Sequence, residues 1–195
     1  MKQKKNKREK SDLVRFRRIN KFIIGKDVLD IGSSEGSLHE LLKRSNPERI
    51  IFSMDKIGNV DFIVDLNKPI KINKKFDTVI AGEIIEHLES PINFIKYCNS
   101  LLKIGGRIII TTPNASGLQY LLNPNWCVNY EEYIGHRQTF TIPMLNKLVE
   151  ENKFEYLSSE YINAFWDRSP LRFMSLFVKR LRPDIMIVAK KVGNF

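Results

Sequence analysis

The sequence predicts an α/β fold, a doubly wound sheet of mostly parallel strands with helices on both faces. Two observations support this prediction. Strand-like and helix-like segments alternate along the chain, and the strand-like segments are apolar on both faces. The expected strands are residues 26–31, 49–54, 62–64, 76–81, 107–112, 154–161 and 184–190. A length of 195 residues fits one domain of this kind with a sizeable core.

Helices are expected between these strands, where apolar residues recur at helical spacing and proline or glycine marks the ends. Segments 12–22 and 37–44 have this character. Pro91 opens a third helix, which the pair Gly105-Gly106 is expected to end. Thr141 is expected to cap a fourth.

The net charge of +10 is concentrated at the N-terminus. Residues 1–22 hold ten Lys and Arg against Glu9 and Asp12, a net charge of +8, so the remaining residues carry only +2. We therefore divide the chain into a basic arm, 1–22, and a domain, 23–195. The arm either contacts phosphate on nucleic acid, anionic lipid or a charged metabolite, or is a solvated tail.

Several classes of protein are disfavoured. No apolar run approaches the roughly 18 residues of a membrane span, and no apolar stretch follows the basic N-terminus as in a signal peptide. Cys98 and Cys127 lie far apart and indicate neither a metal site nor a disulfide framework. We expect a cytoplasmic protein.

Small and polar residues follow the expected strands, where a doubly wound sheet binds its ligand. They are Asp30, Gly32 and Gly36, then Asp55, Asp65, Gly82-Glu83 and Thr112-Pro113-Asn114. The spacing G-x-x-x-G leaves no middle glycine for a pyrophosphate, which disfavours a dinucleotide. Asp55, 23 residues beyond Gly32, can accept both hydroxyl hydrogens of a ribose.

The segment VLDIGSSEG, residues 28–36, resembles motif I of class I S-adenosylmethionine-dependent methyltransferases, with Ser34 in place of the middle glycine. Residues 76–88 resemble motif IV, and the likeness, which extends from Asp27 to Phe154, is to the ubiquinone-biosynthesis O-methyltransferase branch (methyltransferase type 11/23 domain). It implies a Rossmann-like, seven-stranded sheet with an antiparallel last strand, and S-adenosyl-L-methionine as cofactor. The cofactor-binding residues it implies are Asp30, Gly32, Ser33, Gly36, Asp55, Lys56, Asp65, Leu66, Gly82 and Glu83.

The stretch Glu83-Ile-Ile-Glu86-His87 concerns the methyl acceptor. On a helical turn, positions i, i+3 and i+4 share a face, so these two carboxylates and the imidazole could converge. With the later Gly135-His136, the stretch is similar to ubiquinone-type and small-RNA 2′-O-methyltransferases, some of which bind a divalent cation there. The resemblance implies Glu83, Glu86, His87 and His136 as ligands of Mg²⁺, Mn²⁺ or Zn²⁺.

The alternative is a site without metal. Glu83 would then contact the methionine end of the cofactor, Glu86 and His87 would close the pocket, and His136 would act as general base. The catalytic candidates are therefore His136, His87 and Glu83. His39 is expected to be a surface or packing residue.

Two further segments have alternative roles. Trp126, Tyr130, Glu131, Glu132 and Tyr133 in the connection 115–135 form an acceptor pocket or lid, or anchor the loop on the core. The basic and apolar stretch 168–182 is either a helix at a membrane surface or a helix packed on the sheet.

The function expected from these features is O-methylation of a small molecule, a sugar or a lipid-linked intermediate. RNA 2′-O-methylation with metal-assisted chemistry is the alternative favoured by the basic arm. A non-catalytic protein that binds S-adenosylmethionine is a third hypothesis, but damage to Gly32, Asp55 or Glu83, which it predicts, is not seen.

Overall fold

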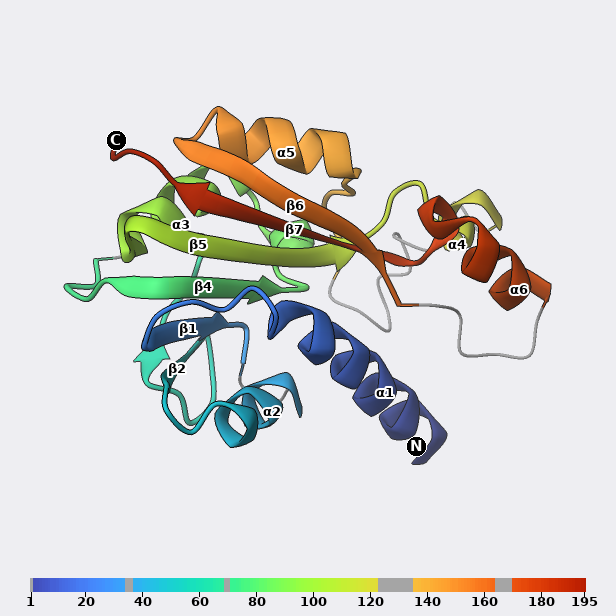
Figure 1. The fold of residues 1–195 in the computed structure, drawn as a ribbon, viewed down its shortest axis with the longest axis horizontal. Coiled ribbons are helices and arrows are strands. Elements are labelled where there is room, and N and C mark those ends of the chain that lie inside the picture. The colour runs from blue at the N-terminus through green and yellow to red at the C-terminus, as the bar shows by residue number, and fades with distance from the viewer. Residues whose placement is uncertain (1, 34–36, 69–70, 123–134, 164–169) are drawn as a thin grey trace.

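The computed structural model describes residues 2–33, 37–68, 71–122, 135–163 and 170–195 (Figure 1). Seven strands form one sheet in the order β3-β2-β1-β4-β5-β7-β6. They are β1 (Asp27–Ile31), β2 (Ile50–Asp55), β3 (Phe62–Ile63), β4 (Phe76–Gly82), β5 (Leu102–Pro113), β6 (Phe154–Ile162) and β7 (Asp184–Lys191). Strands β1 to β5 pair in parallel, whereas β7 runs antiparallel to both β5 and β6. The predicted fold class, with its antiparallel last strand, is confirmed.

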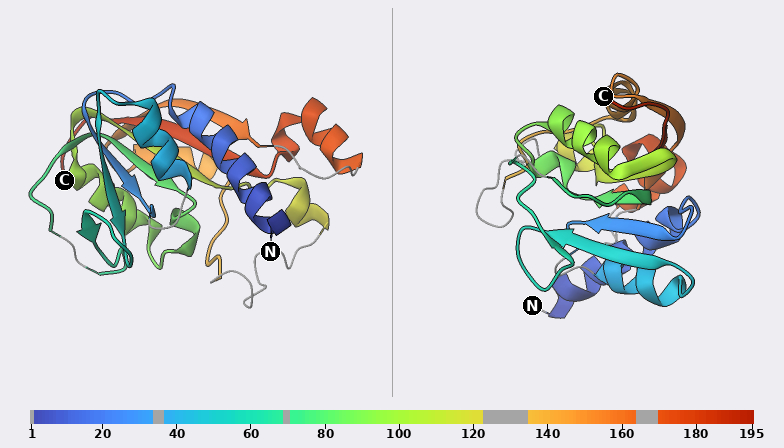
Figure 2. Two further views of the ribbon diagram at one scale, coloured as in Figure 1. Left: turned by 90° about the horizontal axis from the view of Figure 1, so that it is seen from below. Right: turned by 90° about the vertical axis from the view of Figure 1, so that its left-hand side faces the viewer.

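Helices cover both faces of the sheet (Figures 1 and 2). They are α1 (Lys2–Ile19), α2 (Ser37–Ser45), η1 (Ile85–His87), α3 (Pro91–Leu101), α4 (Leu118–Leu122), α5 (Ile142–Glu150), α6 (Pro170–Phe177) and η3 (Lys179–Leu181). Because successive strand residues point to opposite faces, Ile109 packs with α1 and α2, while Ile108 and Ile110 pack with α3 and α5. The all-apolar strands of the sequence are thus explained by burial on both sides.

Two helix starts follow the sequence signals closely. The Ser90 hydroxyl accepts a hydrogen bond from the Asn93 N–H at 3.3 Å, and Pro91 follows it in the first turn of α3. The Thr141 hydroxyl accepts from the Met144 N–H at 3.4 Å and caps α5 in the same way. Both predicted starts are confirmed.

The end of α3 differs from the prediction. The helix stops at Leu101, and β5 begins at the next residue, so the pair Gly105-Gly106 lies inside a strand. Gly105 has a φ of +80°, and a Cβ on Gly106 would lie 2.9 Å from the Lys103 carbonyl oxygen. The pairing with β4 shifts register opposite this segment. The glycines therefore shape a bend in β5, and the prediction that they end the helix was wrong.

The basic arm forms a longer helix than the expected 12–22. Helix α1 runs from Lys2 to Ile19, and its second half packs on the sheet through Phe16 and the fully buried Ile19. No helix among the described residues is both long and apolar enough to cross a membrane.

The order of the strands reverses between β1 and β4, since β1 has β2 on one side and β4 on the other. Ligands of open α/β sheets bind at the carboxyl ends of the strands that flank such a point. In Figure 1 these ends lie on the side of the molecule from which α1, α4 and α6 project.

Candidate active site

The turn after β1 requires glycine at residue 32. Gly32 has a φ of +80°, in the left-handed region, and its N–H donates to the Met54 carbonyl at 2.7 Å. A Cβ at this position would lie only 2.3 Å from Cδ1 of Ile84, in the segment after β4. The turn therefore closes tightly against β2 and against the second half of the site. Ser33 is buried beside it, and Gly36 lies outside the described residues.

Asp30 forms a buried pair with His39. Its Oδ2 lies 3.1 Å from Nδ1 of His39, on the first turn of α2. Burial raises the pKa of Asp30, and the hydrogen bond from His39 opposes part of that rise. His39, expected on the surface or in packing, is a packed and buried residue that supports this predicted cofactor residue.

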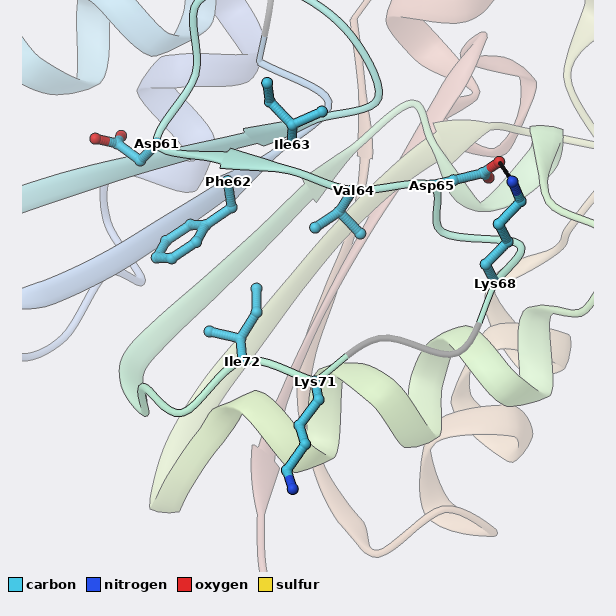
Figure 3. Close-up of a pocket in the computed structure, with 8 residues that line it drawn as sticks. All are labelled: Asp61, Phe62, Ile63, Val64, Asp65, Lys68, Lys71 and Ile72. Atoms are coloured by element: carbon cyan, nitrogen blue, oxygen red, sulfur yellow. Dashed lines mark ion pairs between the residues drawn. The ribbon is translucent and has the colours of Figure 1, made fainter.

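Polar residues on either side of β3 lie beside a hollow of about 490 Å³. The Asp65 carboxylate accepts a hydrogen bond from the Asn67 N–H, which lowers its pKa, and pairs with Lys56 Nζ at 3.4 Å and Lys68 Nζ at 3.8 Å. Figure 3 shows Asp65 and Lys68 at one end of the hollow, beyond the apolar side chain of Val64. Asp55 ends β2, and Leu66 packs on the core.

The end of β4 holds an unusual backbone. Glu83, next to Gly82, has a φ of +57°, a conformation that a residue with a side chain rarely adopts. Its N–H donates to the Thr111 carbonyl on β5 at 2.9 Å, which fixes this turn. The Glu83 Oε1 atom is buried without a hydrogen-bond partner among the described residues. This carboxylate oxygen is therefore a candidate to bind a ligand.

Glu86 is the most deeply buried acidic residue at this end of the sheet, with 1% of its surface exposed. One carboxylate oxygen accepts a hydrogen bond from the Thr112 hydroxyl at 2.9 Å. The other has no hydrogen bond among the described residues and lies 3.9 Å from Nε2 of His87. Burial, and then the charge of Glu83, raise the pKa of Glu86 well above its ordinary value.

His87 and His136 meet although 49 residues separate them. Their ring centroids are 4.8 Å apart at an interplanar angle of 75°. The N–H of Arg137 donates to the Glu86 carbonyl at 2.8 Å, which holds the histidine segment against η1. Burial, and then the neighbouring His87, lower the pKa of His136. Its Nδ1 is buried without a partner in the described part of the chain.

Three of the four proposed metal ligands come together. Candidate ligand atoms of Glu86, His87 and His136 all lie within 4.8 Å of one another, a group that does not include Glu83. The expected helical face does not form, because η1 is a short 3₁₀ turn that begins only at Ile85 and Glu83 precedes it in a left-handed conformation. The cluster is assembled by η1 and the segment before α5.

A cation that the sequence reasoning missed lies among these acids. Arg15 of α1 is largely buried, and its Nη1 would lie 3.8 Å from a Cβ on Gly82. Burial disfavours the charged guanidinium, but the carboxylates of Glu83, Asp184, Asp12 and Glu86 outweigh this and raise the pKa of Arg15. The Asp12–Arg15 spacing of i, i+3 was the only local signal in a segment dominated by cations.

Asp184, at the start of β7, was also missed as a site residue. Burial, and then the charge of Glu83, raise its pKa to about 7, although Arg15 opposes the shift. The Asn163 side-chain amide donates to Asp184 and also to the Ser11 hydroxyl, the latter at 3.0 Å. The ends of β6 and β7 are thereby joined to α1. The proposed lid residues Trp126, Tyr130, Glu131, Glu132 and Tyr133 lie outside the described residues.

Comparison with known proteins identifies the family. A family model described as "Methyltransferase domain" matches residues 3–159. The mitochondrial ubiquinone biosynthesis O-methyltransferase of Dictyostelium discoideum is 28% identical over 123 residues, 50% of this chain and 38% of that protein. The ubiquinone biosynthesis O-methyltransferase of Xanthomonas euvesicatoria pv. vesicatoria (strain 85-10) is 28% identical over 138 residues, 57% of this chain and 58% of that protein. The chain thus spans about half the length of the curated relatives it matches.

Solved structures show the same fold at low identity. A chain of the complex between the Haloferax volcanii Trm112 methyltransferase activator and a methyltransferase superposes with a TM-score of 0.72 at 12% identity, over 97% of this chain and 93% of that one. An S-adenosylmethionine-dependent methyltransferase from Clostridium acetobutylicum ATCC 824 gives 0.64 at 14% identity, over 95% and 92%. From its fold, its motifs and the match over residues 3–159, the chain belongs to the methyltransferase-domain family.

Proposed function

We propose that this chain O-methylates a small-molecule acceptor with S-adenosylmethionine as donor, and that Glu86, His87 and His136 activate the acceptor hydroxyl. The convergence of these three side chains supports the proposal, because their candidate ligand atoms lie within 4.8 Å at the carboxyl edge of the sheet. Among the described residues, Glu86 Oε1 and His136 Nδ1 have no hydrogen bond to satisfy them. Buried polar atoms without a hydrogen-bond partner are candidates for binding a ligand.

The donor side fits S-adenosylmethionine. Gly32 provides a turn without a side chain, Asp55 would accept the ribose hydroxyl hydrogens, and Asp65 would face the adenine. When bound, S-adenosylmethionine supplies an electrophilic methyl group for in-line displacement. Two charged residues complement the methionine end, since Arg15 would pair with its carboxylate and Glu83 with its ammonium.

The acceptor side needs a group that takes a proton from a hydroxyl. His136 is suited to this because burial, and then the neighbouring His87, lower its pKa and so favour the neutral imidazole. The Thr112 hydroxyl holds Glu86 in place by its hydrogen bond. In the alternative arrangement, a divalent cation held by Glu86, His87 and His136 would supply Lewis acidity in place of the histidine base, and carboxylate with imidazole suits Mg²⁺, Mn²⁺ or Zn²⁺.

The names of the relatives support a small-molecule acceptor, since those matched are ubiquinone biosynthesis O-methyltransferases. We infer the same class here, a phenolic, sugar or lipid-linked hydroxyl. RNA 2′-O-methylation is the second candidate, favoured by one observation: α1 carries most of the ten cations of residues 1–22 and projects from the candidate-site end of the molecule.

A methyl-transfer screen tests the proposal. The full chain would be incubated with labelled S-adenosylmethionine and catechols, sugars, lipid-linked glycans or RNA ends, with and without a chelator and re-added Mg²⁺, Mn²⁺ or Zn²⁺. We expect transfer to one hydroxyl class that Glu86→Gln abolishes. Glu89→Gln, a matched change at a side chain that is 59% exposed, should leave transfer intact. Methylation of nitrogen or carbon only, or full activity of Glu86→Gln, would contradict it.

A further inference from the structure

The short helix α6 and the η3 turn after it expose apolar side chains. Met174, Leu176 and Val178 are 47–48% exposed, and Phe177 is 75% exposed. Lys179 and Arg180 follow directly and are exposed as well. We call residues 174–180 the apolar tip. Residues 168 and 169 of the stretch 168–182 lie outside the described residues, so its two alternatives, a helix at a membrane surface and a helix packed on the sheet, both stay predictions.

Hydrogen bonds hold the base of the tip in place. The buried Asn114 amide donates to the carbonyls of Arg180 at 2.9 Å and Arg182 at 2.8 Å. The Gln119 amide donates to the Pro183 carbonyl at 2.8 Å, and the Arg182 guanidinium donates to the Tyr161 carbonyl at 3.0 Å. The exposed side chains therefore project from an anchored support.

The tip projects from the end of the molecule at which the candidate active site lies (Figure 1). Asn114, its main anchor, comes two residues after Thr112, whose hydroxyl binds Glu86. In Figures 1 and 2, α6 and the N-terminal half of α1 project from the same end of the molecule. Two cationic segments thus flank the candidate site on this side.

We propose that the apolar tip inserts into the interfacial region of an anionic lipid membrane. The charge pattern supports this choice, because residues 168–183 hold five cations and no carboxylate. A second copy of the chain on this surface would bring like charges together, whereas lipid phosphates would neutralise them. Met174, Leu176, Phe177 and Val178 would enter the acyl boundary, while Lys179, Arg180 and α1 contact the headgroups. This proposal does not depend on methyl transfer.

Flotation with lipid vesicles tests the proposal on the full chain. We expect it to bind vesicles of phosphatidylglycerol and phosphatidylcholine, and to bind pure phosphatidylcholine far less. The double variant Leu176→Ser/Phe177→Ser should lower the partition coefficient at least about tenfold. The variant Lys179→Gln/Arg180→Gln should lower it about tenfold or more at low salt and little at high salt.

Matched controls come from elsewhere on the surface. Ile57→Ser/Ile63→Ser removes two side chains that are 66% and 70% exposed near the opposite edge of the sheet, and Lys147→Gln removes a cation of α5 whose side chain is 78% exposed. Partition of both controls should stay within about twofold of the parent chain. The thermal unfolding midpoint reports whether each variant folds, and Met174→Ser/Val178→Ser replaces any tip variant that does not.

Three outcomes would overturn the proposal. The first is no binding to the anionic vesicles. The second is full binding by both apolar variants, which would show that α1 binds by charge alone. The third is self-association in sedimentation velocity that the apolar variants abolish, with no effect on vesicle binding. A second copy would then cover the tip.

Discussion

The two halves of the ligand-binding edge differ in how their polar groups are satisfied. On the donor half, at the ends of β1, β2 and β3, Asp30 pairs with His39 and Asp65 with Lys56, while the uncharged Ser33 hydroxyl is buried without a hydrogen bond among the described residues. At the ends of β4 and β5, Glu86 of the acceptor half and Glu83, which borders the donor's methionine end, each keep a buried oxygen without a hydrogen bond among the described residues. A buried polar atom without a partner costs about 1–3 kcal/mol. The ends of β4 and β5 are therefore where a ligand would satisfy charged groups.

Charge shows the same contrast. Lys56 and Lys68 both form ion pairs with Asp65, so the negative charge of this carboxylate is neutralised. Where the two halves meet, the guanidinium of Arg15 interacts with four carboxylates, which are Asp12, Glu83, Glu86 and Asp184. Burial raises the pKa of Glu86 and Asp184, and the negative charge of Glu83 raises both further. Cationic groups of a ligand, or a metal ion, would offset this negative charge.

The largest expected effect concerns the acceptor half alone. His136→Gln should lower the turnover number about 10²-fold or more, because it removes the proposed base or metal ligand. The donor dissociation constant should change less than about threefold, since no proposed donor contact is lost. Steady-state kinetics and calorimetry with S-adenosylmethionine separate the two. Arg137→Gln, at the next residue with a side chain that is 59% exposed, is the control. A loss of donor affinity equal to the loss of turnover would remove the distinction between the halves.

A substitution in the donor half should change the affinity for S-adenosylmethionine more than the turnover number. Asp55→Ala should weaken S-adenosylmethionine binding about 10- to 100-fold, since two hydrogen bonds to a carboxylate are lost. Once donor is saturating, the turnover number should largely recover. Calorimetry measures the affinity, with Glu48→Ala as the control because its side chain is 63% exposed. Unchanged affinity would place the ribose elsewhere.

Arg15 lies between the two halves, and its removal tests whether α1 belongs to the donor site. Arg15→Gln should weaken donor binding about tenfold, the loss of one charge-assisted pair. Arg18→Gln lies on the same helix and removes a pair with Glu160 at 3.2 Å on a more exposed surface. Its effect should stay within about twofold. Equal losses in the two variants would mean that the overall charge of α1 matters, and not the position of Arg15.

The smallest expected effect is on stability. The pKa of Asp184 is about 7 in the folded protein, above the ordinary value of 3.8, so folding favours its protonated form. The stability it contributes is present below about pH 4 and is lost as pH rises through 7. Relative to Asp184→Asn, the parent chain should lose about 1 kcal/mol or more between pH 4 and 8, a value reduced for the partial exposure of the side chain. Urea unfolding of both proteins at the two pH values measures it. A parent chain that gains relative stability with rising pH would show that Asp184 is charged in the folded state.

The same division governs what the sequence could predict. The strands were predictable because runs such as Ile108-Ile109-Ile110 are buried on both faces, and the donor half because its residues directly follow those strands. The left-handed backbone of Glu83 was not predictable. Because of it, Glu83, Glu86 and His87 do not share one face of an α-helix, and a 3₁₀ turn forms at Ile85–His87 instead. Arg15 could not be selected from ten cations, because the carboxylates that distinguish it are brought together only by the fold. His136 was found through a resemblance, since its contact with His87 spans 49 residues.

The hydrogen bonds of Asn163 have a consequence for the order of folding. They join Ser11 of α1 to Asp184 of β7, and the Ser11 contact alone closes a loop of 152 residues. Long loops are closed late, because the chain entropy lost must be recovered by contacts made elsewhere first. During synthesis Asp184 emerges 169 residues after Arg15, the residue of α1 with which it interacts. A nascent chain can therefore form most of the sheet while this part of the site is still open, and its closure marks completion of the native fold.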